Sequence, residues 1–307
     1  MNLKLLFDKK NWIKLLYLYW NNPKNATIES SYNQDDSIIP VYGFYHIYCL
    51  IDGWEQLVEA QLQHVVSSGL YDRLDKLFCG VLIKESEKQK IDKFKEKYDK
   101  MEFMYFSEDG SLFEFQTLSE MQKKTNELPN FVGFYFHTKG ISWIHTNSRV
   151  YNVCMTWREM NEYFLFDRYR LAIHAINGLD YDVYGTNYTK IYNDKYRNIG
   201  LNFFWFSSRY VNKLKELDVS NRSFRFLSEA WICSETHNVY CPFRFTGNDR
   251  NVAVPKELYQ TVPFYKRFMI SSVMYFSRYK WYIYNFLGIR YTIKNPVAEE
   301  EMRRVQK

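Results

Sequence analysis

From residue 41 onward, short continuous apolar runs alternate with stretches whose apolar residues fall on one helical face. The runs, which are typical of strands buried on both faces, are 42–51, 76–83, 101–106 and 131–136. The stretches with helical spacing between them are 54–68, 85–99 and 117–126. Strands and helices in this order predict an α/β fold: a Rossmann-like, mostly parallel sheet flanked by helices on both faces.

The alternation is less regular after residue 140. We expect one long helix at 147–177, followed by shorter elements, namely strands at 181–186 and 201–206 and helices at 210–217 and 226–233. Residues 234–262 hold prolines and a Gly-Asn pair and are expected to form loops. The expected parts are a basic N-terminal helix with a linker (1–40), one α/β domain (41–262), and a basic aromatic helix with a charged tail (263–307).

The net charge of +6 is concentrated at the two ends of the chain. Residues 1–25 carry five Lys and one Asp, and residues 263–294 carry six Lys or Arg and no acid, so the body is mildly acidic. A nucleic-acid-binding body would need a basic groove, which this distribution disfavours. Both ends also contain Trp, Tyr and Phe, which favours amphipathic arms on an anionic membrane surface. The alternative is two ordinary helices that pack on each other or on a second subunit.

The cysteines and the apolar runs bear on the compartment. The five cysteines are widely spaced and include no Cys-x-x-Cys, which disfavours a disulfide scaffold and a structural zinc site. Charged residues interrupt the first twenty positions, unlike a signal peptide, and no uncharged apolar run approaches the ~20 residues that span a bilayer. We expect a cytoplasmic protein that is peripheral on the inner face of the cytoplasmic membrane.

The first candidate for chemistry is the end of the run 131–136, which passes directly into His137, Thr138, Lys139 and Gly140. Ligands of open parallel sheets bind at the carboxyl ends of the strands. At such a position Lys139 would neutralise a diphosphate, His137 would donate to it, and Gly140 would let the backbone approach. The alternative is an ordinary strand end with a solvated lysine and a buried histidine.

A second candidate is the aromatic run 200–210, which contains Asn202, Phe204 and Trp205. Aromatic rings bounded by Asn and Ser suit a wall on which sugars stack, and a plain core strand is the alternative.

A third candidate is Glu229, which lies beside Trp231 in an otherwise apolar short helix. A carboxylate in such surroundings can have a raised pKa and act as a general base, with Trp231 holding a sugar ring. The alternative is a carboxylate near a helix N-terminus, paired with Arg222 or Arg225.

The pair Asp180 and Asp182 has the Asp-x-Asp spacing that supplies oxygen ligands to Mn or Mg. Here the pair follows a predicted helix and precedes a predicted strand, so we interpret it as a turn and assign no metal ligand.

Taken together, these segments resemble a family of bacterial GT-A-type glycosyltransferases from capsule and lipopolysaccharide O-antigen gene clusters. The resemblance runs from His46 to about Trp231, roughly 60% of the chain. Its centre is the His-Thr-Lys-Gly segment at 137–140. The other matching residues are Gln61-Leu62, Ser68-Gly69-Leu70-Tyr71, Glu114, Thr117-Leu118, Trp157-Arg158, Met160, Asp182-Val183, Gly185, Asn187, Asn202-Phe203-Phe204-Trp205, Glu229 and Trp231.

The resemblance implies a GT-A-like domain that transfers a sugar from a nucleotide-diphosphate sugar to a saccharide acceptor, often a lipid-linked one. We expect the donor across the ends of the first two strands, near Asp52 and Gly80, with its diphosphate at His137, Thr138, Lys139 and Gly140. Asn202, Phe204, Trp205 and Trp231 would hold sugar rings, and Glu229 would be the base of an inverting reaction.

The expected cofactor is none or a divalent Mn or Mg. The segment at 137–140 contains no acid where related folds place Asp-x-Asp, so Lys139 would supply the charge that a metal otherwise supplies. The missing pair also keeps an alternative open: a non-catalytic, membrane-associated scaffold with a glycosyltransferase-like fold.

Overall fold

The computed structural model describes residues 31–146, 148–191, 196–220 and 227–243, together with the isolated positions 253, 254, 256, 259, 260 and 265. The predicted N-terminal arm lies outside the described residues, and so does the C-terminal arm apart from Tyr265. No helix in the described part of the chain is long and apolar enough to cross a membrane.

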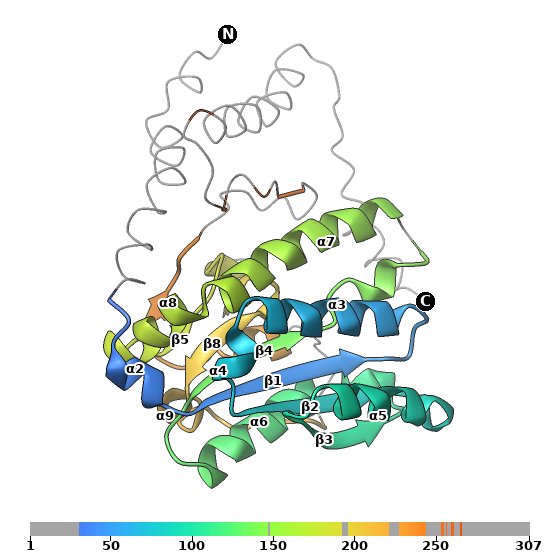
Figure 1. The fold of residues 1–307 in the computed structure, drawn as a ribbon, viewed down its shortest axis with the longest axis horizontal. Coiled ribbons are helices and arrows are strands. Elements are labelled where there is room, and N and C mark those ends of the chain that lie inside the picture. Colours follow the sequence, from blue (N-terminus) through green and yellow to red (C-terminus); the bar gives the residue numbers. More distant parts are fainter. Residues whose placement is uncertain are drawn as a thin grey trace.

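The core of the fold is a seven-stranded sheet in the order β3-β2-β1-β4-β8-β5-β9 (Figure 1). Four of its strands, all mutually parallel, are β1 (Val41–Tyr48), β2 (Lys76–Leu82), β3 (Met101–Ser107) and β4 (Val132–His137). The others are β5 (Val183–Tyr184), β8 (Phe204–Ser207) and β9 (Val239–Tyr240). Strand β8 is antiparallel to both β4 and β5, and β9 is parallel to β5. The predicted α/β fold with a mostly parallel sheet is confirmed.

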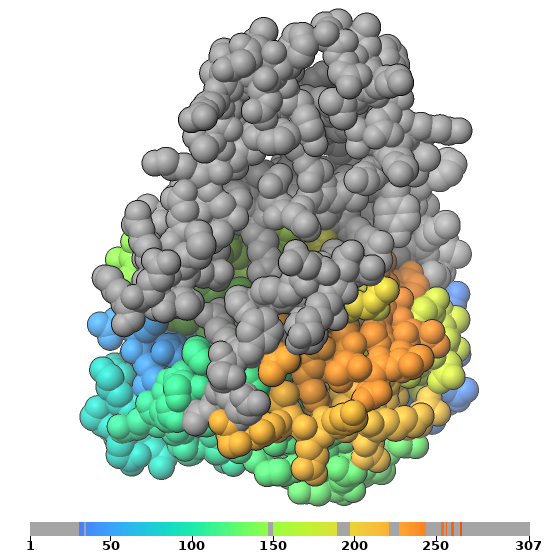
Figure 2. Space-filling model, turned by 180° about the vertical axis from the view of Figure 1, so that it is seen from behind, coloured from blue at the N-terminus to red at the C-terminus, as the bar shows by residue number. Residues whose placement is uncertain are grey.

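Helices cover both faces of this sheet. The main helices on one face are α3 (Trp54–Ser67), α5 (Lys88–Lys97) and α8 (Tyr169–Ile173). On the other face lie α6 (Phe115–Glu127), α9 (Ser208–Val211) and α10 (Leu227–Trp231). Seen from behind, the segment 227–243, in orange, covers part of the back of the body beside residues 196–220 (Figure 2). The shorter elements include α4 (Leu70–Arg73), η2 (Glu85–Glu87), η3 (Gly110–Leu112) and a hairpin of β6 (Thr189–Ile191) and β7 (Tyr196–Asn198).

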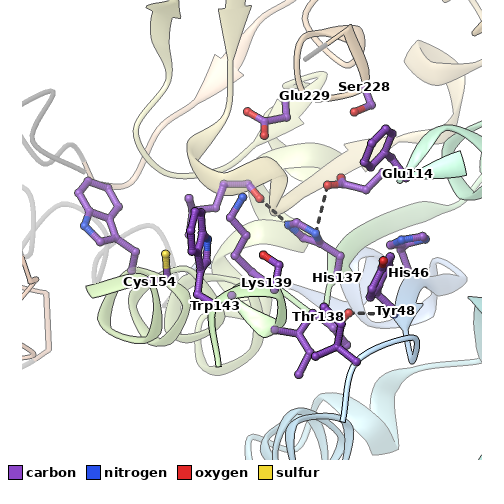
Figure 3. Close-up of a pocket in the computed structure, with 17 residues that line it drawn as sticks. His46, Tyr48, Glu114, His137, Thr138, Lys139, Trp143, Cys154, Ser228 and Glu229 are labelled. Atoms are coloured by element: carbon purple, nitrogen blue, oxygen red, sulfur yellow. Dashed lines mark hydrogen bonds and ion pairs between the residues drawn. The ribbon is translucent and has the colours of Figure 1, made fainter. Parts of the chain in front are cut away.

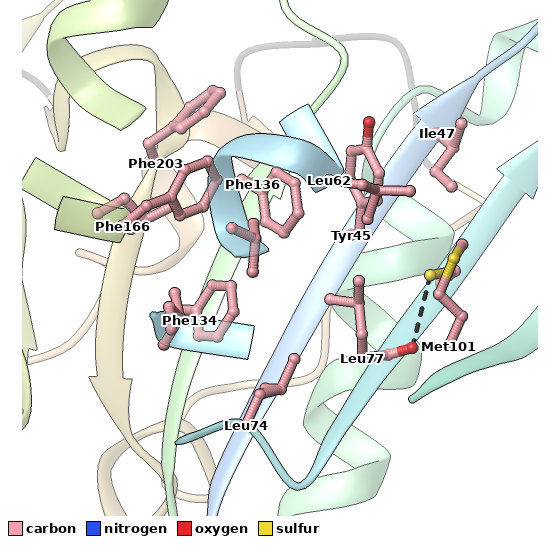
Figure 4. Close-up of a cluster of buried hydrophobic side chains, with 14 of the residues drawn as sticks. Tyr45, Ile47, Leu62, Leu74, Leu77, Met101, Phe134, Phe136, Phe166 and Phe203 are labelled. Carbon is pink, nitrogen blue, oxygen red and sulfur yellow. Dashed lines mark hydrogen bonds between the residues drawn. The ribbon is translucent and has the colours of Figure 1, made fainter. Parts of the chain in front are cut away.

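Alternating side chains of the central strands fill two hydrophobic cores. Tyr45 of β1 packs toward α3, whereas its neighbour Phe44 packs toward α6. In the first core the Tyr45 ring stacks on Phe136, with ring centroids 4.1 Å apart, and Phe166 closes the cluster (Figure 4). Both faces of the central strands are therefore buried, which explains why these strands are continuous apolar runs in the sequence.

Two predicted elements differ from the structure in their extent. The predicted strand 201–206 begins only at Phe204, because Leu201 and Asn202 have φ angles of 54° and 58° and form the turn η7 (Gly200–Asn202). The predicted helix 210–217 is shorter, since α9 ends at Val211.

The predicted long helix at 147–177 is interrupted by two π-helical turns. In order, its pieces are α7 (Ser148–Glu162), the π-helical turn η5 (Tyr163–Asp167), α8, and a second π-helical turn, η6 (His174–Gly178).

Helix α2 (Gln34–Ile38) lies in the predicted linker and has a capping box between Asn33 and Asp36. The fully buried Asp36 carboxylate also pairs with His174, 2.6 Å from its Nδ1, which fixes α2 to the body.

Ion pairs of His64 with Asp167 and Glu162 join α3 to η5 and make the folding stability depend on pH. His64 Nε2 lies 2.7 Å from Asp167, and its Nδ1 lies 3.6 Å from Glu162. Burial lowers the pKa of His64, but the hydrogen bonds and attraction from the two carboxylates outweigh it and raise the pKa to about 9. The stabilisation is therefore complete below the unfolded pKa of about 6.5 and is lost as the pH rises through about 9.

The substitution that tests these ion pairs is His64→Gln. We expect the free energy of unfolding of wild type to exceed that of the variant by about 1–2 kcal/mol less at pH 9.5 than at about pH 6. This figure allows for solvent screening of a partly exposed ring. Urea unfolding of both proteins across this range measures it. A difference in the free energy of unfolding between the two proteins that stays constant with pH would contradict a contribution from these ion pairs.

Candidate functional site

A cavity of about 260 Å³ opens at the carboxyl ends of β1 and β4 (Figure 3). These strands are neighbours in the sheet, with His46 of β1 opposite His137 of β4. From β1 the strand order continues to β2 and β3 on one side and to β4 on the other, so this is where the direction of winding reverses. Ligands of open α/β sheets bind at such reversal points.

The segment after β4 forms one wall of the cavity. The Thr138 hydroxyl accepts a hydrogen bond from the Tyr48 backbone N–H at 2.9 Å, which joins the ends of β4 and β1. Gly140 has a φ of 90°, a conformation that favours glycine, and starts the turn η4 (Ile141–Trp143). The Lys139 side chain lines the cavity, is partly exposed, and makes no hydrogen bond or ion pair with any of the described residues. Its backbone N–H donates to the His137 carbonyl at 2.8 Å. It is thus an available cation at the site.

His137 is held by the protein at both ring nitrogens. Its Nε2 donates to the Leu201 carbonyl at 2.9 Å, and its Nδ1 lies 3.2 Å from Glu114 Oε1. Both neighbours are acceptors, so the ring donates from both nitrogens and its charge is offset by Glu114. The prediction that His137 donates to a diphosphate is wrong, because neither N–H is left for a ligand.

Glu114, directly before α6, organises this wall. Its Oε2 accepts from the Tyr135 hydroxyl at 3.0 Å and from Asn202 Nδ2 at 2.5 Å. Burial, and then Glu114, raise the pKa of Tyr135 well above its usual value, so the phenol stays a neutral donor. Asn202 is buried and bound to Glu114, so its predicted role in sugar contact is replaced by a structural one. The sequence showed Glu114 as a matching residue but gave no sign of this function.

Glu229 enters the same cavity from α10. It is 5% exposed and lines the cavity beside Ser228. In Figure 3 the charged ends of Glu229 and Lys139 turn toward the same space from different sides. None of the residues that the structure describes makes a hydrogen bond or ion pair with the Glu229 carboxylate. Two residues that the sequence singled out, Lys139 and Glu229, thus line one cavity, and their roles stay predictions.

The predicted sugar-stacking wall is wrong. Phe204 and Trp205 are 0% exposed, because β8 lies between β4 and β5 with helices on both faces. The indole N–H of Trp205 donates to the Leu165 carbonyl at 2.9 Å. Trp231 is likewise packed in the second core, and its indole N–H donates to the Lys215 carbonyl at 2.9 Å. None of these three rings offers a face to a ligand.

The cavity does not reach the two residues expected near the donor at β1 and β2. Asp52 is exposed and is not part of the cavity wall, although its backbone carbonyl accepts a hydrogen bond from His145 Nε2 at 2.9 Å. Gly80 lies inside β2, where an added Cβ would be 2.3 Å from Thr117 Oγ1 and 2.5 Å from the Tyr105 ring. The glycine therefore makes room for two side chains rather than for a ligand.

The Asp-x-Asp pair is a turn, as interpreted from the sequence. Asp180 Oδ1 pairs with Arg209 at 2.9 Å, and Asp182 Oδ2 accepts from the Asn238 backbone at 2.8 Å. Both precede β5 and so lie at its amino end, away from the cavity.

Within the described part of the chain, no group of three or more His, Cys, Asp or Glu could hold a metal ion. At the cavity, both Glu114 oxygens are already bound, so the described residues do not form a Mn or Mg site of their own.

Comparisons with known proteins place the chain in no family. No protein-family model matches it, and no curated protein sequence does. Among solved structures, it is similar to 4-diphosphocytidyl-2C-methyl-D-erythritol synthase from Anaerococcus prevotii, with 14% sequence identity and a TM-score of 0.33 over 77% of this chain and 98% of that chain. A similarity this low supports no inference about function.

Proposed function

We propose that the protein is a glycosyltransferase that moves a sugar from a nucleotide-diphosphate sugar to a saccharide acceptor. One observation carries the proposal: the side chains of Lys139 and Glu229, which have no partners among the described residues, line one cavity at the reversal point of the sheet. A diphosphate leaving group needs a cation, and an attacking hydroxyl needs a base. The cavity offers one group of each kind.

The proposed reaction assigns each group one task. Glu229 takes the proton of the acceptor hydroxyl, whose oxygen forms a bond to the anomeric carbon of the donor sugar. The bond from that carbon to the diphosphate oxygen breaks, and the nucleoside diphosphate leaves with the electron pair. Lys139 offsets the negative charge that develops on the leaving group. This assignment applies to an inverting transfer, in which the base lies opposite the leaving group.

The biological setting is part of the same proposal. A lipid-linked acceptor, cell-surface polysaccharide synthesis and a peripheral position on the cytoplasmic membrane rest on the family resemblance and on the basic aromatic ends of the chain. Flotation with anionic liposomes tests the membrane contact, since a protein that stays wholly unbound would contradict it.

The change that tests the diphosphate contact is Lys139→Ala. We expect it to weaken donor binding about 10–100-fold, the cost of losing one charge-assisted hydrogen bond to phosphate. Isothermal titration with the donor selected by a thermal-shift screen of UDP-, GDP-, CMP- and dTDP-sugars, with and without Mn or Mg, measures the effect. Lys213→Ala, at an exposed lysine away from the cavity, is the matched control and should bind as wild type does.

The non-catalytic scaffold remains the alternative outcome of this experiment. Stabilisation by a bound donor follows mass action, so a genuine ligand raises the melting temperature with concentration. A wild-type protein that responds to none of the sugar nucleotides would favour the scaffold, and equal donor affinity in Lys139→Ala and wild type would remove Lys139 from the site.

A further inference from the structure

His46 is a buried histidine at the cavity whose hydrogen bonds lead away from it. Its Nδ1 lies 2.8 Å from Thr117 Oγ1 in α6, and the Tyr105 hydroxyl of β3 lies 2.6 Å from the same Thr117 oxygen. The residue is 3% exposed and lines the cavity. We propose that this chain of side chains holds His46 as a neutral Nε2–H donor that binds an uncharged oxygen of the ligand, an inference that rests on the proposed function.

The direction of the hydrogen bonds decides which ring nitrogen carries the proton. A phenol has one hydrogen to donate, and the described residues offer the Tyr105 hydroxyl no acceptor other than Thr117. If Tyr105 donates to Thr117, then Thr117 donates to His46 Nδ1, and the ring proton is on Nε2. The opposite direction would leave the Tyr105 hydrogen without an acceptor among the described residues, which is unfavourable in a half-buried side chain.

The surroundings also keep the ring uncharged. Burial is the main cause that lowers the pKa of His46 to about 4, and the positive His137 on the adjacent strand lowers it further. Glu114 acts in the opposite direction and does not overcome them. The Tyr105 phenol also stays neutral, because burial raises its pKa far above the physiological range. His46 is therefore a donor and not a proton acceptor at neutral pH.

The Nε2 atom is available to a ligand. None of the described residues accepts a hydrogen bond from it. His46 lines the cavity, and Nε2 is the ring nitrogen that is not bonded to Thr117. Because Lys139 supplies the positive charge of the cavity, the neutral N–H suits a carbonyl or hydroxyl oxygen, such as one on the base or sugar of a nucleotide sugar.

The first test reads the state of the ring without any ligand. Two-dimensional NMR of protein with ¹⁵N-labelled histidine at pH 7, assigned by loss of signals in His46→Gln, should show a neutral ring protonated on Nε2. Thr117→Ser keeps the hydroxyl and should preserve this state, whereas Thr117→Val should shift the ring toward a mixture of tautomers. A charged ring, or one protonated on Nδ1 in wild type, would overturn the proposal.

The second test measures the ligand contact by titration with the nucleotide sugar selected in the thermal-shift screen and with its nucleoside diphosphate. His46→Leu should weaken binding about 5–10-fold, and His46→Gln, whose amide can place an N–H near Nε2, should recover most of it. Weakening of both ligands places the contact on the nucleotide, and weakening of the sugar nucleotide alone places it on the sugar.

The outcomes separate this inference from the proposed function. Equal affinity of a folded His46→Leu protein for both ligands would overturn the contact while leaving the glycosyltransferase proposal intact. A wild-type protein that binds none of the screened nucleotides would overturn the proposed function and the contact together, while the NMR result would still decide the state of the ring.

Discussion

Replacing Glu229 with glutamine is expected to lower kcat about 10²–10⁴-fold, with little change in donor affinity. Glutamine has nearly the same shape as glutamate, so the 5% exposed position in α10 should keep its packing. What is lost is the ability to take the proton of the acceptor hydroxyl. Single-turnover measurement of sugar transfer, together with donor titration, separates the chemical step from binding.

Two comparisons make the Glu229 result specific. Glu216→Gln changes an exposed carboxylate that does not line the cavity and should leave kcat unchanged. Full turnover by Glu229→Gln would contradict the role of this residue as the base. A loss of donor binding with unchanged kcat would instead make Glu229 a binding residue.

Truncation of Trp205 to alanine is expected to destabilise the protein by about 3–5 kcal/mol, the usual cost of removing a large aromatic side chain from a core. The ring is 0% exposed, packs against Phe134 with centroids 4.7 Å apart, and donates its N–H to the Leu165 carbonyl. Removal leaves a cavity in the centre of the sheet and a carbonyl without its donor. Urea unfolding measures the change in the free energy of unfolding.

The same experiment distinguishes a core role from a sugar-stacking role. Trp205→Phe keeps most of the apolar volume and should cost clearly less than alanine. If the ring instead stacked on a sugar, alanine would weaken ligand binding and leave the unfolding midpoint unchanged. That second pattern would contradict the placement of β8 in the core.

Part of the candidate site was predictable because strand ends are visible in a sequence. The change from Phe136 to the polar residues His137 and Lys139 is abrupt, and a parallel sheet brings such ends to one edge. Glu229 was also identified, since a carboxylate between apolar residues is unusual. The sequence could not show that His137 is already bound at both nitrogens, because its partners lie 23 and 64 positions away.

The sequence by itself determined the strands and helices up to β4, because the period of apolar residues is a local property that backbone geometry converts directly into structure. Only the tertiary structure decided which aromatic residues are core and which polar residues are available. Trp205 would look the same in a strand at the edge of a cavity, and its burial depends on β4, β5 and the helices packed around them. The state of His46 likewise depends on Thr117, 71 positions away, because burial and hydrogen bonding are properties of neighbours in space.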